Sequence, residues 1–135
     1  MSYDKLIIYT DGGARGNPGP AAIGAVLKDE SGKIVSEISQ CIGETTNNQA
    51  EYRAVIAALE KAKTLGASEL EFFLDSELVV KQLKREYKVK NDGLASLFLR
   101  IHNLTVGFKK VTFKHIRREL NADADKLVNL ALDNK

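Results

Sequence analysis

Four acidic residues stand in this sequence where a strand ends or where a helical pattern calls for an apolar side chain. Asp11 and Asp75 each follow a short apolar run, and Glu51 and Asp125 each fall close to the apolar stripe of a helix-like segment. Converging carboxylates repel one another and are costly to desolvate unless a cation neutralises them. The pattern therefore predicts a pocket for divalent metal built from these four residues.

The available ligand types narrow the choice of metal and of reaction. Cys41 is the only cysteine, which excludes a cysteine-based zinc site and an intrachain disulfide, and His102 and His115 are the only imidazoles. Oxygen ligands favour hard ions that keep some of their water, so Mg²⁺ or Mn²⁺ is expected rather than Zn²⁺. A kinase-like nucleotide site is disfavoured, because Gly12 to Pro20 contains neither glycine-rich nucleotide motif. The residues favour metal-assisted phosphodiester hydrolysis.

Each acid also has an ordinary structural explanation when it is taken alone. Asp11 can form a turn before two glycines, and Asp75 with Ser76 can cap a helix. Glu51 can pair with a buried arginine, and Asp125 can favour a helix N-terminus electrostatically. These explanations need four independent coincidences, whereas one metal site accounts for all four positions.

The elements that must position these acids alternate between strand and helix in the order βββαβααβα. Strands are predicted at 5–10, 21–28, 33–42, 70–74 and 108–116, and helices at 48–65, 77–87, 94–104 and 121–132. Thr46 or Asn47 is the expected N-cap of the first helix, and Asn121 that of the last. A strand, a helix and a strand in succession predict a right-handed parallel crossover, so the fold class is α/β with a five-stranded mixed sheet, three antiparallel strands beside parallel ones, flanked by helices.

Length and composition predict one ordinary soluble domain spanning residues 1–135. The chain is 44% hydrophobic and 28% charged, enough for one core and too short for two. No apolar stretch approaches the length of a membrane span and no leader precedes the first strand, so we expect a cytoplasmic protein with no membrane partner.

Charge is distributed unevenly along the chain. Residues 1–75 carry 7 basic and 11 acidic side chains, whereas residues 76–135 carry 13 basic and 7 acidic ones. The basic residues gather between Lys81 and Lys90 and between Lys109 and Arg118. This asymmetry indicates either an anionic partner for the second half or two solvated basic faces.

Five short motifs, in order along the chain, resemble those of type 1 ribonuclease H. They are Tyr9-Thr10-Asp11-Gly12-Gly13, Gly16-Asn17-Pro18-Gly19, Thr45-Thr46-Asn47-Asn48-Gln49-Ala50-Glu51, Leu74-Asp75-Ser76, and His115 followed by Asn121-Ala122-Asp123-Ala124-Asp125. The resemblance covers the chain from about Lys5 to Leu132. It implies the ribonuclease H-like fold and a single catalytic domain that hydrolyses the RNA strand of RNA/DNA hybrids, leaving 5′-phosphate and 3′-hydroxyl ends.

The resemblance also implies how the catalytic residues divide the work between two Mg²⁺ ions, for which Mn²⁺ is expected to substitute. Asp11 would bridge both ions, and Asp125 would complete the site of the ion that holds the attacking water. Glu51 and Asp75 would hold the ion at the leaving group. His115 matches a histidine of a mobile loop that assists proton transfer or product release.

Hybrid recognition carries over to a further set of positions. Short amides suit the shallow minor groove, which displays 2′-hydroxyls and base edges, so weak sequence preference is expected. In members of the family Thr46 corresponds to a residue that grips a DNA phosphate. The implied substrate-binding residues are Gly12, Asn17, Thr46, Asn47, Asn48, Ser76, Glu77 and Asn121.

Three departures from the family pattern accompany this match. Glu77 stands where many relatives have glutamine, and Gln49 where some have arginine. The segment from Lys81 to Leu94 is short and lacks the tryptophan-bearing basic handle of several bacterial members, so weaker hybrid affinity is expected. Two alternatives stay open, a nuclease of the same fold that cuts double-stranded RNA and a catalytically silent nucleic-acid-binding domain. No protein partner is implied, and a monomer is expected.

Overall fold

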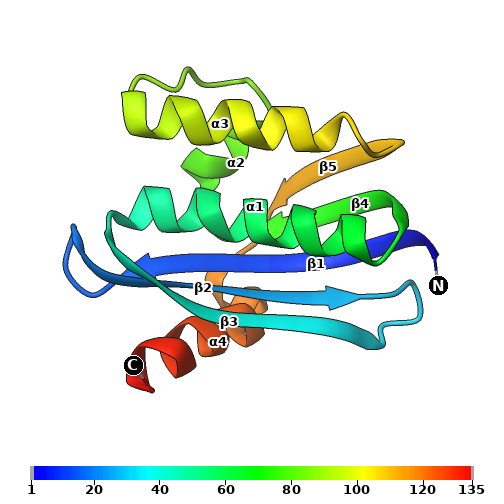
Figure 1. Ribbon diagram of the computed structural model, residues 1–135, viewed down its shortest axis with the longest axis horizontal. Coiled ribbons are helices and arrows are strands. Elements are labelled where there is room, and N and C mark those ends of the chain that lie inside the picture. Colours follow the sequence, from blue (N-terminus) through cyan, green and yellow to red (C-terminus); the bar gives the residue numbers. More distant parts are fainter. Residues whose placement is uncertain (1, 135) are drawn as a thin grey trace.

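The computed structural model describes residues 2–134 and contains the predicted succession of elements. They are β1 (Tyr3–Ala14), β2 (Gly19–Lys28), β3 (Ile34–Thr45), α1 (Asn47–Thr64), β4 (Ala67–Leu74), α2 (Glu77–Leu83), α3 (Asp92–Thr105), β5 (Lys110–His115), the short 3₁₀ helix η1 (Arg118–Asn121) and α4 (Ala122–Asp133) (Figure 1). The order βββαβααβα is confirmed, with one 3₁₀ turn added before the last helix.

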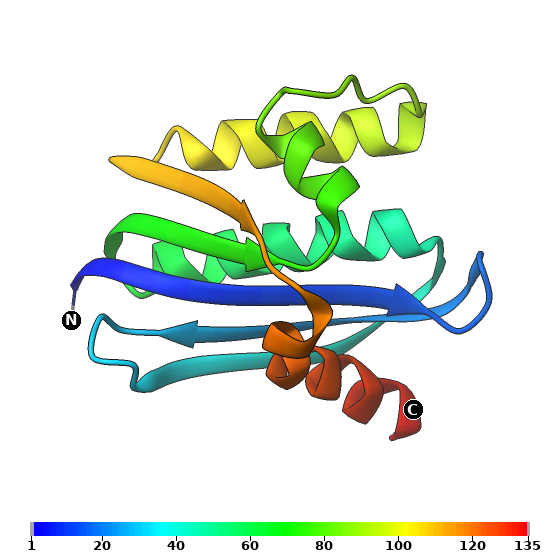
Figure 2. The same cartoon turned by 180° about the vertical axis from the view of Figure 1, so that it is seen from behind.

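The five strands form one mixed sheet in the spatial order β3-β2-β1-β4-β5. β2 pairs antiparallel with both β1 and β3, whereas β4 pairs parallel with both β1 and β5. Figure 2 shows that β1, β4 and β5 consequently point toward the same edge of the sheet. Since Tyr9 of β1 lies opposite Phe73 of β4, the residues that follow them emerge side by side at that edge.

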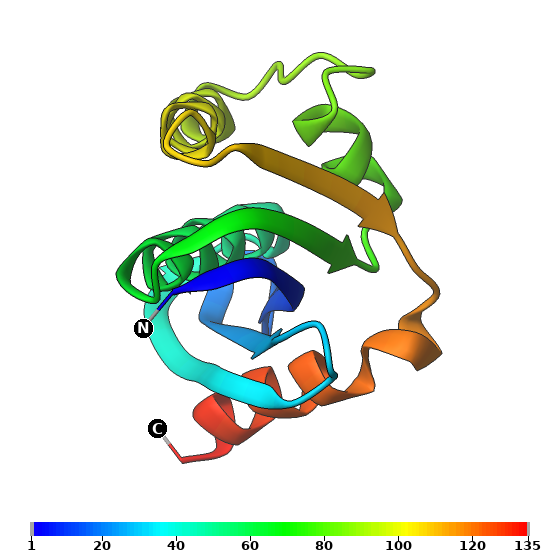
Figure 3. The same ribbon diagram turned by 90° about the vertical axis from the view of Figure 1, so that its right-hand side faces the viewer.

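Helices cover both faces of the sheet. α1 packs on one face with α3 beyond it, and α4 packs on the opposite face against β2 and β3 (Figures 1 and 3). Gly24 of β2 allows this close approach, because a Cβ atom there would lie 2.4 Å from the carbonyl oxygen of Ala124. Within residues 2–134, no helix combines the length and apolar composition needed to cross a membrane.

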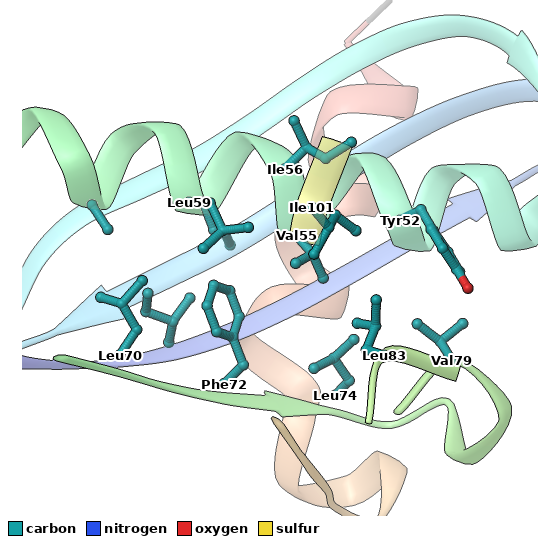
Figure 4. Close-up of a cluster of buried hydrophobic side chains, with 14 of the residues drawn as sticks. Tyr52, Val55, Ile56, Leu59, Leu70, Phe72, Leu74, Val79, Leu83 and Ile101 are labelled. Atoms are coloured by element: carbon teal, nitrogen blue, oxygen red, sulfur yellow. The ribbon is translucent and has the colours of Figure 1, made fainter. Parts of the chain in front are cut away.

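The main core lies between α1 and the sheet. Leu6 and Ile8 of β1 and Phe72 of β4 are fully buried against apolar side chains of α1. Figure 4 shows this cluster, to which α2 and α3 contribute Val79, Leu83 and Ile101. A smaller cluster under α4 contains Ala22, Val128 and Leu132. On β1 itself, Leu6 and Ile8 are buried whereas Ile7 and Tyr9 on the other face are only partly buried, so the complete cover of both faces that its apolar sequence predicts is not reached.

The second helix ends earlier than its sequence pattern predicts. α2 stops at Leu83 rather than near Tyr87, because Arg85 adopts a left-handed backbone conformation with φ 66°. The Arg85 N–H donates to the Gln82 carbonyl, and the Glu86 N–H donates to the Lys81 carbonyl. This is the Schellman pattern of helix termination, whose left-handed position is usually glycine.

Replacing Arg85 with glycine is expected to stabilise the protein. The side chain disfavours the left-handed conformation, so Arg85→Gly should raise the free energy of unfolding by about 0.5–1 kcal/mol. Urea unfolding measures the change. Lys84→Gly is the matched control, since Lys84 has right-handed helical φ and glycine there should destabilise the protein. Equal losses of stability in the two variants would show that the left-handed conformation of Arg85 is not unfavourable.

Candidate active site

Three of the four predicted carboxylates meet where the pairing between β1 and β4 ends. Asp11 lies within β1, Glu51 in the second turn of α1, and Asp75 directly after β4. One oxygen from each lies within 4.8 Å of the other two. Asp11 is 8% and Glu51 is 7% exposed, so the cluster is largely shielded from solvent. Parallel pairing of β1 with β4 thus brings Asp11 and Asp75 together as predicted, although β1 does not end before Asp11 but continues to Ala14 in its pairing with β2.

The fourth acid approaches this group from the opposite face of the sheet. Asp125 lies in the first turn of α4, close enough to Asp11 to raise the pKa of that carboxyl group. It lies outside the compact group of three. All four acids line one cavity of about 430 Å³. Asp11 is the residue that interacts with each of the other three.

Crowding of these acids changes their proton affinity. Burial, followed by the charges of Asp75 and Asp125, raises the pKa of Asp11 from 3.8 to about 7. Burial and the neighbouring Asp11 and Asp75 raise the pKa of Glu51 well above its usual value, although the Gly12 N–H donates to Glu51 Oε1 at 2.7 Å and opposes the rise. Ionising the whole cluster is therefore unfavourable without a cation. Oxygen-only donors of this kind fit Mg²⁺ or Mn²⁺.

The raised pKa of Asp11 predicts an unusual pH dependence for the metal-free protein. Between pH 3.8 and about 7 the folded state binds more protons at Asp11 than the unfolded state does. The free energy of unfolding should therefore fall as pH rises through this window, by about 4 kcal/mol from this group. Urea unfolding at pH 5 and pH 8 in chelator measures the slope, and Mg²⁺ should restore stability at pH 8. An equally steep slope in Asp11→Asn would contradict the assignment.

Asn121 does not have the capping role that the sequence suggests. Its side chain makes no N-cap hydrogen bond to α4, because the 3₁₀ turn η1 precedes that helix directly. Instead the side-chain nitrogen donates to the Thr10 carbonyl at 2.8 Å and to Asp75 Oδ2 at 2.9 Å. Asn121 is 1% exposed, and its side-chain nitrogen is engaged by Asp75 and Thr10.

The glycine-rich loop after Asp11 is tied to the start of α1. Asn47 Oδ1 accepts the Ala14 N–H at 2.8 Å, and Asn17 Oδ1 accepts the Asn47 N–H at 3.0 Å. Thr46 caps α1 by accepting the Gln49 N–H. Of the implied substrate-binding residues, those on the cavity wall are Gly12, Asn47, Asn48 and Ser76. The loop and the start of α1 thus form one continuous rim beside the acids.

His115 and Glu77 face each other beside the site. His115 ends β5, and its Nδ1 atom lies 3.9 Å from Glu77 Oε2, with 38% of the histidine side chain exposed. The cavity wall includes neither residue. Glu77 also pairs with Lys81 at 3.6 Å. His115 pairs with Leu74, the residue before Asp75, so it is an accessible side chain on the strand next to the one that carries Asp75.

Cationic side chains also reach the cavity, although they were not singled out from the sequence. Arg15 and Arg118 line it, and Arg15 pairs with Asp133 at 2.7 Å across the end of α4. Arg118 belongs to a basic cluster that sequence alone could not distinguish from a solvated face. Only the return of the chain through η1 and α4 brings it to the acids. In the sequence, the one sign that Arg118 belongs to the site is its position three residues after His115.

Sequence and fold both match a known family. A family model described as "Reverse transcriptase-like" matches residues 9–131. The Ribonuclease H of Ruthia magnifica subsp. Calyptogena magnifica is 35% identical over 148 residues, which cover 96% of this chain and 97% of that protein. The chain belongs to the ribonuclease H family. Its resemblance to type 1 members, inferred above from five motifs, is confirmed, as is the fold class.

Solved members of the ribonuclease H family superpose closely on the chain. RNase H1 of Halobacterium salinarum has a TM-score of 0.95 at 44% identity and covers 97% of this chain and 99% of that structure. LC11-RNase H1, solved in complex with an RNA/DNA hybrid, has a TM-score of 0.91 at 50% identity, covering 96% and 97%. The bifunctional protein Rv2228c of Mycobacterium tuberculosis is 42% identical over 130 residues, 96% of this chain and 36% of that protein. The chain thus spans about a third of the length of that ribonuclease H relative.

Proposed function

We propose that this protein is a metal-dependent endonuclease that hydrolyses the RNA strand of RNA/DNA hybrids to 5′-phosphate and 3′-hydroxyl products. The observation that carries the proposal is the meeting of Asp11, Glu51 and Asp75 within 4.8 Å, with Asp125 beside Asp11. The match to LC11-RNase H1, solved with a hybrid, supports the substrate. Family membership alone would leave a silent binding domain possible, whereas a complete acidic cluster favours catalysis.

The four carboxylates are suited to holding two Mg²⁺ ions, for which Mn²⁺ is expected to substitute. When bound, such ions activate a water molecule and stabilise the leaving oxygen. Asp11 interacts with each of the other acids, which supports its assignment as the shared ligand. Asp125 approaches from α4 and Glu51 from α1, on opposite faces of the sheet, which supports their assignment to different ions.

The rim formed by the glycine-rich loop and the start of α1 is suited to the hybrid. Asn47 and Asn48 present short amides at the cavity, and Asn17 is held beside Asn47. Such amides can contact 2′-hydroxyls and base edges in a shallow minor groove without reading sequence. Arg15 and Arg118 add positive charge toward phosphates at the same cavity. Thr46, Ser76 and Glu77 flank this surface as further contacts.

One assay tests the function against its alternatives. Purified protein is incubated with end-labelled RNA/DNA hybrid, RNA duplex and DNA duplex, each with Mg²⁺ and with chelator. Metal-dependent cleavage of hybrid with 5′-phosphate ends is expected, and Asp11→Asn purified in parallel excludes a contaminating nuclease. Faster cleavage of the RNA duplex than of the hybrid would make double-stranded RNA the preferred substrate. Binding without cleavage of any substrate would favour a silent binding domain.

His115 is expected to assist turnover without holding metal. His115→Ala should lower kcat for hybrid cleavage by about 10- to 100-fold, because an accessible imidazole near the cluster can transfer a proton or speed product release. Metal affinity, measured by titration calorimetry, should not change. His102→Ala is the matched control, since His102 lies on α3 beside Arg85, away from the acids. Equal rates for both variants would contradict the role.

A further inference from the structure

A single buried amide connects the parts of the chain that carry the acids. Asn121 stands between η1 and α4, and both hydrogens of its side-chain nitrogen are used. One goes to the carbonyl of Thr10, the residue before Asp11, and the other to Asp75 Oδ2. The end of β1, the end of β4 and the start of α4 are therefore joined at one point.

The chemistry of the partners fixes how this amide is oriented. A carbonyl and a carboxylate both accept hydrogen bonds, so the atom between them must be the nitrogen of Asn121. Among the described residues no group donates to Asn121 Oδ1, although that oxygen is buried. Burying an acceptor without a partner is unfavourable for folding. The two hydrogen bonds that the Asn121 nitrogen donates, and not any contact of its oxygen, therefore account for the position of this side chain.

We propose that Asn121 is a positioning residue that orients Asp75, and through the backbone Asp11 and Asp125, for metal binding. This inference deepens the proposed function and rests on it. The Asp75 carboxylate that accepts from Asn121 through Oδ2 also offers an oxygen within 4.8 Å of one oxygen each of Asp11 and Glu51. A donor to a ligating carboxylate fixes its orientation, and loss of such a partner costs about 10- to 100-fold in metal affinity or activity.

The same contact sets the position of Asp125. Asn121 immediately precedes α4, and Asp125 lies one helical turn later. Holding Asn121 against Thr10 thus fixes where α4 begins relative to β1, and with it the approach of Asp125 to Asp11. One side chain in this way influences three of the four acids.

The test compares Asn121→Ala with Asn121→Asp in the full chain. Metal affinity is measured by Mn²⁺ titration without substrate, and kcat and KM with hybrid. For Asn121→Ala we expect about 10-fold weaker Mn²⁺ binding and a kcat about 10- to 100-fold lower, with an unchanged KM for hybrid. High metal concentration should recover part of the rate. Asn121→Asp should lose more, because an ionised acid donates neither bond and repels Asp75.

Matched variants separate positioning from mere stability. Ile101→Val removes a methylene from the buried core far from the cluster and should lower the melting temperature while leaving Mn²⁺ affinity unchanged. Asn134→Ala removes an exposed amide from the far end of α4 and should change neither property. If Asn121→Ala proves too unstable, Asn121→Ser keeps a donor and should show an intermediate affinity.

The outcomes are distinct. A folded Asn121→Ala that binds Mn²⁺ and turns over like the parent protein overturns the inference, as does a loss of affinity matched by Ile101→Val. If the parent protein binds Mn²⁺ but cleaves no hybrid, the proposed function fails, while the metal titration still decides the role of Asn121.

Discussion

Asp11→Asn should lower the rate of hybrid cleavage by at least about 10³-fold while making the metal-free protein more stable. The rate falls because Asp11 interacts with all three other acids, so its loss affects both proposed ions. Stability rises because burial and neighbouring carboxylates have already raised the pKa of Asp11 to about 7, and a neutral amide removes that repulsion. A residue whose replacement lowers activity but raises stability is one that is retained for function.

Single-turnover cleavage in Mg²⁺ and urea unfolding in chelator at pH 8 measure the two changes. Asp4→Asn is the matched control, since it is the same substitution at an exposed position of the same strand. It should leave both values unchanged. Near-normal cleavage by Asp11→Asn would contradict the bridging assignment, and a loss of stability would contradict the repulsion.

Asp125→Asn should retain more activity in Mn²⁺ than Asp11→Asn does.

The spacing of apolar residues along the chain, which differs between strands and helices, was sufficient to predict most of this fold. The apolar run before Asp11 and the run before Asp75 predict parallel strands, and the register of β1 with β4 brings the two acids to one edge, although β1 continues past Asp11 to Ala14. Glu51 follows from helical periodicity, since it shares a face with the buried Val55 and Ala58. These features depend on local sequence and on one rule of topology, which is why sequence reveals them.

Features that depend on tertiary contacts were missed or misassigned. Asn121 precedes a helix and so resembles an N-cap, but its hydrogen bonds cross 46 and 111 residues of sequence to Asp75 and Thr10. Arg85 gives no local signal for a left-handed conformation, because glycine is the residue expected there. Arg15 reaches the cavity only because its loop folds back against α4. In each case a long-range partner overrides the local preference.

Gly12→Ala is expected to destabilise the protein by about 2–3 kcal/mol and to weaken metal binding. A Cβ atom at Gly12 would lie 2.3 Å from the carbonyl carbon and oxygen of Ala50 and 2.6 Å from the Glu51 nitrogen. These are backbone atoms of α1, which cannot rotate away, so β1 and α1 must separate. Separation also breaks the hydrogen bond from the Gly12 N–H to Glu51 Oε1, which holds that carboxylate in the cluster.

The neighbouring glycine provides the control for this steric argument. A Cβ atom at Gly13 would meet only Val128 Cγ1, at 3.9 Å, so Gly13→Ala should change the free energy of unfolding by less than about 0.5 kcal/mol. Urea unfolding and Mn²⁺ titration of both variants measure the contrast. Equal stability of the two variants would show that β1 and α1 can move apart freely. A large difference would show instead that contact between the two backbones sets the distance between Asp11 and Glu51, and hence the size of the metal site.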